Sequence, residues 1–356
     1  MSRGKKISLG IVTGIGVLII LAVILANEPK VKPPQNEAYT AGIVARSTLV
    51  QTSEGEIYLL TRNELMLLDG HKLVPVKNLD GTFSKIFWND NKFYLSEDSK
   101  EGDVETNFLV LDAKFNELYS HTIPGRIYDF VVRDSTAYLL VDNKLMLLEI
   151  NTNNPIASVD LRKPGKSIVA NGNYAYIIDD IPMYIHIIDI SNPHNPLKYT
   201  GKLSGVDAYL DTQDFVKNKW YILDSWYTNT EADYSQYLNV LGTKPQDLAT
   251  KPALYELTNY KDFNVPATGK LYISDIKVEG DLLYALGYSS GHSGIKLSIF
   301  SLTEVVKQLS LIELDDADEP INFVLDGKKV YVAGQNGVYV VDAQDPSKPL
   351  VLYTLP

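Results

Sequence analysis

Polar residues recur at one position of a repeated pattern, about nine residues before a tyrosine. The tyrosine stands in a short hydrophobic run, seen seven times, at Tyr58, Tyr94, Tyr138, Tyr176, Tyr221, Tyr284 and Tyr331. The first run has Leu49 at this place, and the later runs have Lys85, Asp129, Ser167, Asp214, Asp275 and Asn322. Asp214 stands seven residues before Tyr221 and is taken as equivalent, because the turn of this blade is expected to be two residues shorter. Oxygen-bearing side chains in such a set predict a site for a hard cation such as Ca²⁺, or a polar ligand pocket.

A second candidate site lies in the segment 224–237, which combines aromatic and acidic residues. Its members are Asp224, Trp226, Tyr227, Glu231, Asp233, Tyr234 and Tyr237. This composition is typical of a loop that contacts a protein or a glycan. The alternative is that Trp226 and Tyr227 only pack the segment onto its scaffold. The acidic run Glu313–Glu319 is expected to be a solvated loop, since it lacks the spacing and the glycine of an EF-hand.

Signals for catalysis are few in the sequence. It holds five histidines without HExxH or other paired spacing, and no cysteine. The segment Gly291–Gly294 does not fit the G-x-S-x-G pattern of a nucleophile elbow. Neither a Walker loop nor a Rossmann glycine fingerprint occurs. We therefore expect no catalytic residue and no cofactor.

The spacing of the tyrosines predicts the fold. They recur about every 45 residues, the length of one four-stranded propeller blade. A second hydrophobic run follows each tyrosine and usually ends in an acid, as at Asp69, Asp112 and Asp342. Short strands bounded by turn residues, with no amphipathic helix after residue 26, indicate an all-β protein. The sequence predicts a β-propeller of seven four-stranded blades over residues 43–356, preceded by one N-terminal transmembrane helix.

Two of these blades resemble a known repeat. The fourth contains Asn171-Gly172-Asn173-Tyr174-Ala175-Tyr176 and then Ile187-Ile188-Asp189-Ile190-Ser191-Asn192-Pro193, and the seventh contains Val340-Val341-Asp342 followed by Asp345-Pro346. Both resemble the unit of LVIVD-repeat propellers, in which Asp or Asn before proline starts a turn. The resemblance implies a propeller that is commonly exported or surface-associated, and it implies no defined reaction.

The predicted propeller places both candidate sites on one face. The innermost strand of each blade starts at the face that carries the loops between second and third strands. The polar set is therefore expected at the mouth of the central channel, beside long loops at 96–107, 224–236 and 287–294. A water-filled channel with solvated carboxylates, one paired with Lys85, is the alternative to a binding site. A metal-dependent, Ca-type propeller hydrolase using Asp129, Asp214, Asp275 and Asn322, or a ligand-binding protein using the channel, is the alternative function.

The N-terminal region predicts export. Residues 7–26 are uncharged and long enough to span a bilayer, and Arg3, Lys5 and Lys6 precede them. We expect an uncleaved signal anchor over 1–26 with the N-terminus in the cytoplasm; a cleaved signal peptide is the alternative. Residues 27–42 contain Pro29, Pro33 and Pro34, which predict a semi-rigid stalk. The propeller is then held at the cell membrane by a single span, on the periplasmic or extracellular side.

Charge narrows the class of partner. The whole chain carries −11 and its first 26 residues carry three cations and no acid, so the remainder carries −14. An acidic body lacks the basic footprint that nucleic acids require. The sequence therefore predicts a non-catalytic interaction or scaffolding module whose partner is a membrane or envelope protein.

Overall fold

The computed structural model describes residues 48–98, 105–152, 154–179, 184–203, 208–227, 234–249, 253–259, 272–288, 294–303, 306–315 and 318–355. Within these ranges the backbone forms 28 strands and one 3-10 helix, η1 (Pro245–Ala249). The predicted transmembrane segment 7–26 and the stalk 27–42 lie outside them. No helix in the described part of the chain is long and apolar enough to cross a membrane.

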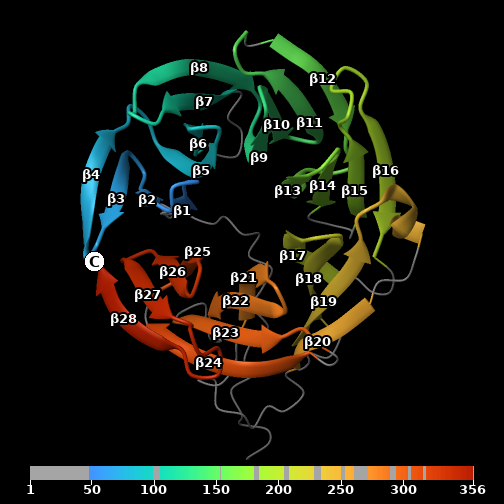
Figure 1. The fold of residues 1–356 in the computed structure, drawn as a ribbon. Helices are drawn as coiled ribbons and strands as arrows, with labels where there is room; N and C mark the ends of the chain where they lie inside the picture. The colour runs from blue at the N-terminus through green and yellow to red at the C-terminus, as the bar shows by residue number, and fades with distance from the viewer. Residues whose placement is uncertain are drawn as a thin grey trace, which may run out of the picture. The chain divides into compact units, whose positions relative to one another are not determined.

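The strands form seven sheets of four, which are the blades of a propeller (Figure 1). The innermost strands are β1 (Thr48–Gln51), β5 (Phe83–Asn89), β9 (Ile127–Arg133), β13 (Gly165–Asn171), β17 (Ala208–Val216), β21 (Tyr272–Glu279) and β25 (Pro320–Asp326). The second strands are β2 (Ile57–Leu60), β6 (Lys92–Glu97), β10 (Thr136–Val141), β14 (Tyr174–Asp179), β18 (Lys219–Tyr227), β22 (Leu282–Tyr288) and β26 (Lys329–Gly334). The third strands are β3 (Glu64–Asp69), β7 (Glu105–Asp112), β11 (Lys144–Glu149), β15 (Tyr184–Asp189), β19 (Tyr234–Gly242), β23 (Ile295–Ser301) and β27 (Val338–Asp342). The outermost strands are β4 (Lys72–Asn78), β8 (Glu117–Pro124), β12 (Asn154–Asp160), β16 (Leu197–Lys202), β20 (Ala253–Asn259), β24 (Lys307–Asp315) and β28 (Leu350–Leu355).

Every blade is a meander of consecutive antiparallel strands, so the predicted seven-bladed, four-stranded propeller is confirmed. Blade one is β1–β4 and blade seven is β25–β28, each built from its own four strands. Among the described strands the ring therefore closes by side-chain packing and hydrogen bonding between β1 and β25, without exchange of a strand.

The seven tyrosines hold equivalent places in their second strands. Each pairs with the third strand at the same register, as in Tyr58 with Leu67 and Tyr331 with Val340. In six blades the turn from innermost to second strand has two residues, and its first residue has positive φ, as at Asp90, Gly172 and Lys217. Two-residue turns of this kind match the right-handed twist of hairpin strands. The constant turn explains the constant nine-residue spacing in the sequence.

The core is divided among the blade junctions. The buried apolar residues of the described chain form seven clusters, and each cluster joins two consecutive blades, the last joining blade seven to blade one. Each repeated tyrosine belongs to the cluster between its own blade and the next. Burial at every junction makes the propeller one rigid ring, on which the channel side chains hold fixed places.

Candidate functional site at the channel mouth

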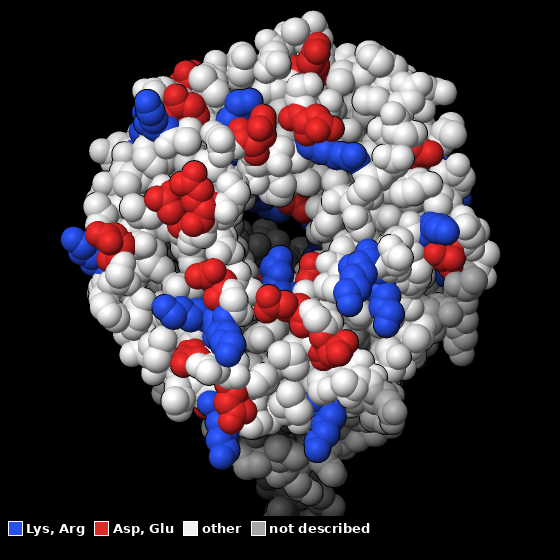
Figure 2. All heavy atoms as spheres, in the orientation of Figure 1, with Lys and Arg blue, Asp and Glu red and all other residues white. Residues whose placement is uncertain are grey.

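One residue from each innermost strand forms a ring at the mouth of the channel. By strand register these residues, the channel ring, are Thr48, Lys85, Asp129, Ser167, Thr212, Asp275 and Asn322. All seven side chains are partly buried. Figure 2 shows acidic and basic side chains beside one another around the central hollow.

Two assignments made from the sequence are wrong in register. Asp214 pairs with Tyr221 and lies two residues farther along the channel, while Thr212 holds the ring position of blade five. The expected shorter turn does not exist: blade five has the same two-residue turn, and Lys217 adopts the positive φ that glycine adopts in blades four, six and seven and aspartate in blades two and three. In blade one the turn Thr52–Glu56 is longer, which puts Thr48 in the ring and leaves Leu49 buried.

A β-bulge precedes the ring residue in six blades. The register shift leaves one residue unpaired just before the ring, namely Ser84, Tyr128, Lys166, Asp211, Ser274 and Ile321. Bulges end regular pairing and re-aim the neighbouring side chains. The bulge thus places the ring residue of these six blades at the channel mouth.

Hydrogen bonds tie the ring residues across the blades. Lys85 Nζ lies 2.9 Å from Asp129 Oδ1, and Asp129 Oδ2 accepts the backbone N–H of Ile168 at 2.9 Å. Thr212 Oγ1 donates to Asp275 Oδ1 at 3.1 Å. Asn322 pairs with both backbone groups of Leu49, at 2.9 and 3.0 Å, and so joins blade seven to blade one. The paired Lys85 and Asp129 agree with the ion pair expected from the sequence.

Below the ring, two charged residues interrupt an apolar layer. Asp214 and Lys277 stand opposite the tyrosines of their blades, where the other blades have Val50, Phe87, Val131, Val169 and Val324. Burial raises the pKa values of Asp214 and Asp275, although the charge of Lys277 acts against the shift. Burial disfavours the Lys277 ammonium, yet the carboxylates of Asp275, Asp214 and Asp129 outweigh it and raise its pKa.

The channel carboxylates do not converge on a point. Within the described ranges, no group of three or more His, Asp or Glu side chains is arranged to hold a metal ion. Asp129 uses both oxygens in bonds to Lys85 and Ile168, and Asp214 accepts the backbone N–H of Val278. The geometry suits a polar channel that binds water or a small polar group, and it gives no support to the metal-dependent hydrolase.

The second candidate segment belongs to strands, where a loop was expected. Asp224, Trp226 and Tyr227 lie in β18, and Tyr234 and Tyr237 lie in β19; Glu231 and Asp233 lie outside the described residues. The two strands pair up to Tyr227 with Tyr234. Asp224 is only 2% exposed, so it is a buried residue of blade five rather than a surface contact.

Sequence reasoning missed three buried polar residues, two of which join blades. Gln236 bonds both backbone groups of Ile273 in blade six, at 2.7 and 2.8 Å. Gln213 accepts from Trp220 Nε1 at 2.8 Å and donates to Ser167 in blade four. Asp318, in the run expected to be solvated, is 1% exposed and accepts from Asn336 and Tyr339. For Gln213 the sequence did hold a signal, because a polar residue stands there at a strand position that is apolar in the other blades.

Comparison with known proteins supports the fold and the repeat. No curated protein sequence matches the chain. The WD40 domain of Neurospora crassa Pan2 is similar in structure, with a TM-score of 0.58 at 11% identity over 88% of this chain and 92% of that one. Kluyveromyces lactis Hsv2 gives 0.57 at 9% identity, over 87% and 98%.

An extracellular domain of the proposed one-component system BT4673 from B. thetaiotaomicron gives a TM-score of 0.56 at 13% identity. The likeness covers 83% of this chain and 38% of that one. The family profile of the LVIVD repeat matches residues 165–199 and 322–354, which are most of blades four and seven. The chain is therefore a seven-bladed propeller that contains LVIVD repeats.

Proposed function

We propose that this protein is a non-catalytic interaction module, a β-propeller tethered to the cell membrane by residues 7–26 and exposed outside the cytoplasm. Its partner is a membrane or cell-envelope protein, of which the propeller is an accessory subunit. The acidic body, −14 after residue 26, favours a partner with a basic contact surface.

The observation that carries this proposal is the long hairpin of blade five. Past the ring level, β18 continues from Leu223 to Tyr227, whereas β14 of blade four ends at Asp179, one residue beyond Ile178. The sequence puts Trp226, Tyr227 and Tyr234 at the end of this ladder. Aromatic residues on a rigid support are typical energetic centres of protein interfaces.

The connections at this face add surface on the same side. Between second and third strands, blades two, five and six have residues 98–104, 228–233 and 289–294, while blades one and three have only 61–63 and 142–143. Unequal loops on an otherwise regular scaffold mark the face on which recognition develops.

Purification from native membranes in mild detergent tests the proposal. The double variant Trp226→Ala/Tyr227→Ala should lose its co-purifying partner while its melting temperature stays near that of the wild type. Tyr199→Ala, an exposed aromatic residue on the outer strand β16, is the matched control and should keep the partner. Retention of the partner by the double variant would refute the interface.

The membrane tether has its own test. Protease added to spheroplasts should cut the propeller body and leave the N-terminal segment with the membrane. A mature protein whose first residue is Asn27 would contradict the uncleaved anchor.

A further inference from the structure

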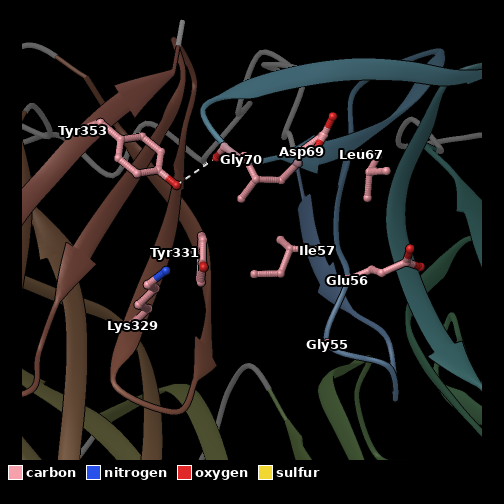
Figure 3. Close-up of a pocket in the computed structure, with 10 residues that line it drawn as sticks. Gly55, Glu56, Ile57, Leu67, Asp69, Gly70, Lys329, Tyr331 and Tyr353 are labelled. Carbon is pink, nitrogen blue, oxygen red and sulfur yellow. Dashed lines mark hydrogen bonds between the residues drawn. The ribbon is translucent and has the colours of Figure 1, made fainter.

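A cavity of about 330 Å³ lies between the last and the first blade, at the end of the blades opposite the channel ring (Figure 3). It is bounded by the turns after β1 and β3 and by the start of β26. We call it the junction pocket; its lining includes Glu56, Ile57, Leu67, Asp69, Gly70, Lys329, Tyr331 and Tyr353. Volumes of this size are the lower range of small-molecule sites in proteins.

Comparison of the seven junctions explains why this one is hollow. The residue directly after each third strand, here called the plug position, faces the tyrosine of the preceding blade. It is occupied by Gly70, Ala113, Ile150, Ile190, Thr243, Leu302 and Ala343. Ile150, Ile190 and Ala343 are buried in the junction clusters, and Leu302 packs against one.

Where the plug side chain is small in blades two and five, an aromatic residue at the position before the tyrosine fills the junction. The ring of Phe93 lies 5.0 Å from that of Tyr58, and Trp220 lies 5.2 Å from Tyr176. Blade one has Gly70 as the plug and Ile57 before the tyrosine. Blade seven has a similarly small pair, Ala343 and Val330, but Ala343 is buried whereas Gly70 is exposed. A Cβ added at Gly70 would meet no atom within 4 Å.

The floor of the junction pocket is apolar and carries one uncommitted hydroxyl. Ile57 and Tyr331 are 4% and 6% exposed. The Tyr331 hydroxyl makes no hydrogen bond within the described residues, whereas the equivalent hydroxyl of Tyr176 donates to Thr243 O at 2.7 Å. Tyr353 donates to Gly70 O at 3.0 Å, which closes the outer side of the pocket.

Opposite charges stand on the two walls. Lys329 rises from blade seven and Asp69 from blade one (Figure 3). The carboxylate of Glu56 points away from Lys329 and accepts the Tyr58 hydroxyl at 2.9 Å. Lys329 forms no ion pair among the described residues. Asp69 is 3.8 Å from Lys72, but both side chains are largely exposed, so this pair contributes little. The walls therefore offer the Lys329 cation on one side and the Asp69 carboxylate on the other, about an apolar floor.

We propose that the junction pocket binds a small zwitterion with an apolar body, of the amino-acid or dipeptide class. The ligand carboxylate contacts the Lys329 ammonium and the Tyr331 hydroxyl. The ligand ammonium lies toward Asp69, and the apolar side chain covers Ile57 and Leu67. This site is separate from the proposed protein interface, which lies at the other end of the blades.

Titration of the full-length protein with leucyl-phenylalanine tests the proposal by calorimetry or ligand-observed NMR. We expect a dissociation constant of about 0.1–1 mM, as for a small ligand held by two exposed charges. The C-terminal amide and the N-acetyl form should each bind about tenfold more weakly. Lys329→Met should remove the preference for the free acid over the amide, and Asp69→Asn should reduce the preference for the free amine. Lys348→Met, an exposed lysine outside the pocket, is the matched control and should bind as the wild type does.

Filling the cavity gives the decisive variant. Ile57→Trp copies the arrangement of Trp220 against Tyr176, and should abolish binding without lowering the melting temperature. If this variant does not fold, Ile57→Phe, copied from Phe93, replaces it. The proposal is overturned if no form of the dipeptide binds, or if a folded filled variant binds as tightly as the wild type. Trp226→Ala/Tyr227→Ala should bind the dipeptide normally, so failure of one proposal is distinguishable from failure of the other.

Discussion

The junction between blades four and five and the junction between blades seven and one place the same tyrosine in different surroundings. Tyr176 packs its ring on Phe215 and Trp220, at 4.3 and 5.2 Å, and its hydroxyl is hydrogen-bonded. Tyr331 faces Ile57 and Gly70 across a cavity. The backbone repeat sets where the tyrosine lies, whereas the side chains around it and the exposure of the plug position decide whether the junction is core or pocket.

The two junctions should differ most in the free energy of unfolding that is lost when the residue before the second-strand tyrosine is shortened to alanine. Trp220→Ala removes a side chain with no exposed surface and should lower the free energy of unfolding by about 3–5 kcal/mol. Ile57→Ala should cost about 2 kcal/mol, at the low end for such a change, because Ile57 already borders open volume. Denaturant unfolding of both variants measures the difference. Equal losses would mean that the two junctions are packed alike.

Closure of the ring between blades seven and one depends on the side-chain amide of Asn322, which bonds Leu49. Asn322→Leu leaves the backbone N–H and C=O of Leu49 without their partners, and Leu49 is 3% exposed. We expect a loss of at least about 2 kcal/mol, since two buried groups lose their partner and each costs roughly 1–3 kcal/mol. Limited proteolysis should then cut near β1 first. Ser167→Ala, which loses one longer bond of 3.2 Å from Gln213, should cost about 1 kcal/mol or less.

The repeat was predictable from the sequence because its turn length is constant. In blades two to seven, two turn residues separate the innermost strand from the second, so a fixed offset from the tyrosine finds the channel ring. In blade five this offset leads to Thr212, and the assignment of Asp214 is wrong because it assumes a shorter turn. Lys217 shows that a residue other than glycine holds the positive-φ turn position, which the sequence did not reveal.

The candidate sites were less predictable because they depend on depth and volume. Asp224 looks like a loop acid beside Trp226, but three further strand pairs make it part of a buried ladder. The junction pocket has no motif, and its signal is the lack of a side chain at Gly70, visible only against Ile150, Ile190 and Leu302. The missing side chain at Gly70 indicates a pocket only after the blades have been aligned by strand register.

Loss of a single hydroxyl should have a moderate effect at each junction. Tyr176→Phe leaves the carbonyl of Thr243 without this donor, and Tyr353→Phe does the same at Gly70. We expect losses of about 0.5–1.5 kcal/mol, with Tyr353→Phe at the lower end because water reaches Gly70, which is exposed. Thermal unfolding at neutral pH measures both. A larger loss for Tyr353→Phe would mean that this bond, and not packing, holds the hollow junction closed.

The smallest expected effect appears at alkaline pH. Burial raises the pKa of Tyr176 to about 12, and burial together with Asp326 and Tyr353 raises the pKa of Tyr331. A raised pKa means that the folded protein keeps the phenolic proton to higher pH than the unfolded chain. The associated stability is therefore complete below about pH 10 and is lost as the pH rises toward the folded-state value.

The stability gap between wild type and Tyr176→Phe should accordingly narrow between about pH 9 and 12, by roughly 1 kcal/mol at pH 10.5 and by more as the pH approaches 12. Tyr331→Phe should show a smaller narrowing, since its hydroxyl borders a cavity that water enters and that solvates the phenolate. Urea unfolding at a series of pH values measures both gaps. Filling the junction pocket with Ile57→Trp should then make the alkaline behaviour of Tyr331 approach that of Tyr176. If it does not, burial in the pocket is not what distinguishes the two tyrosines.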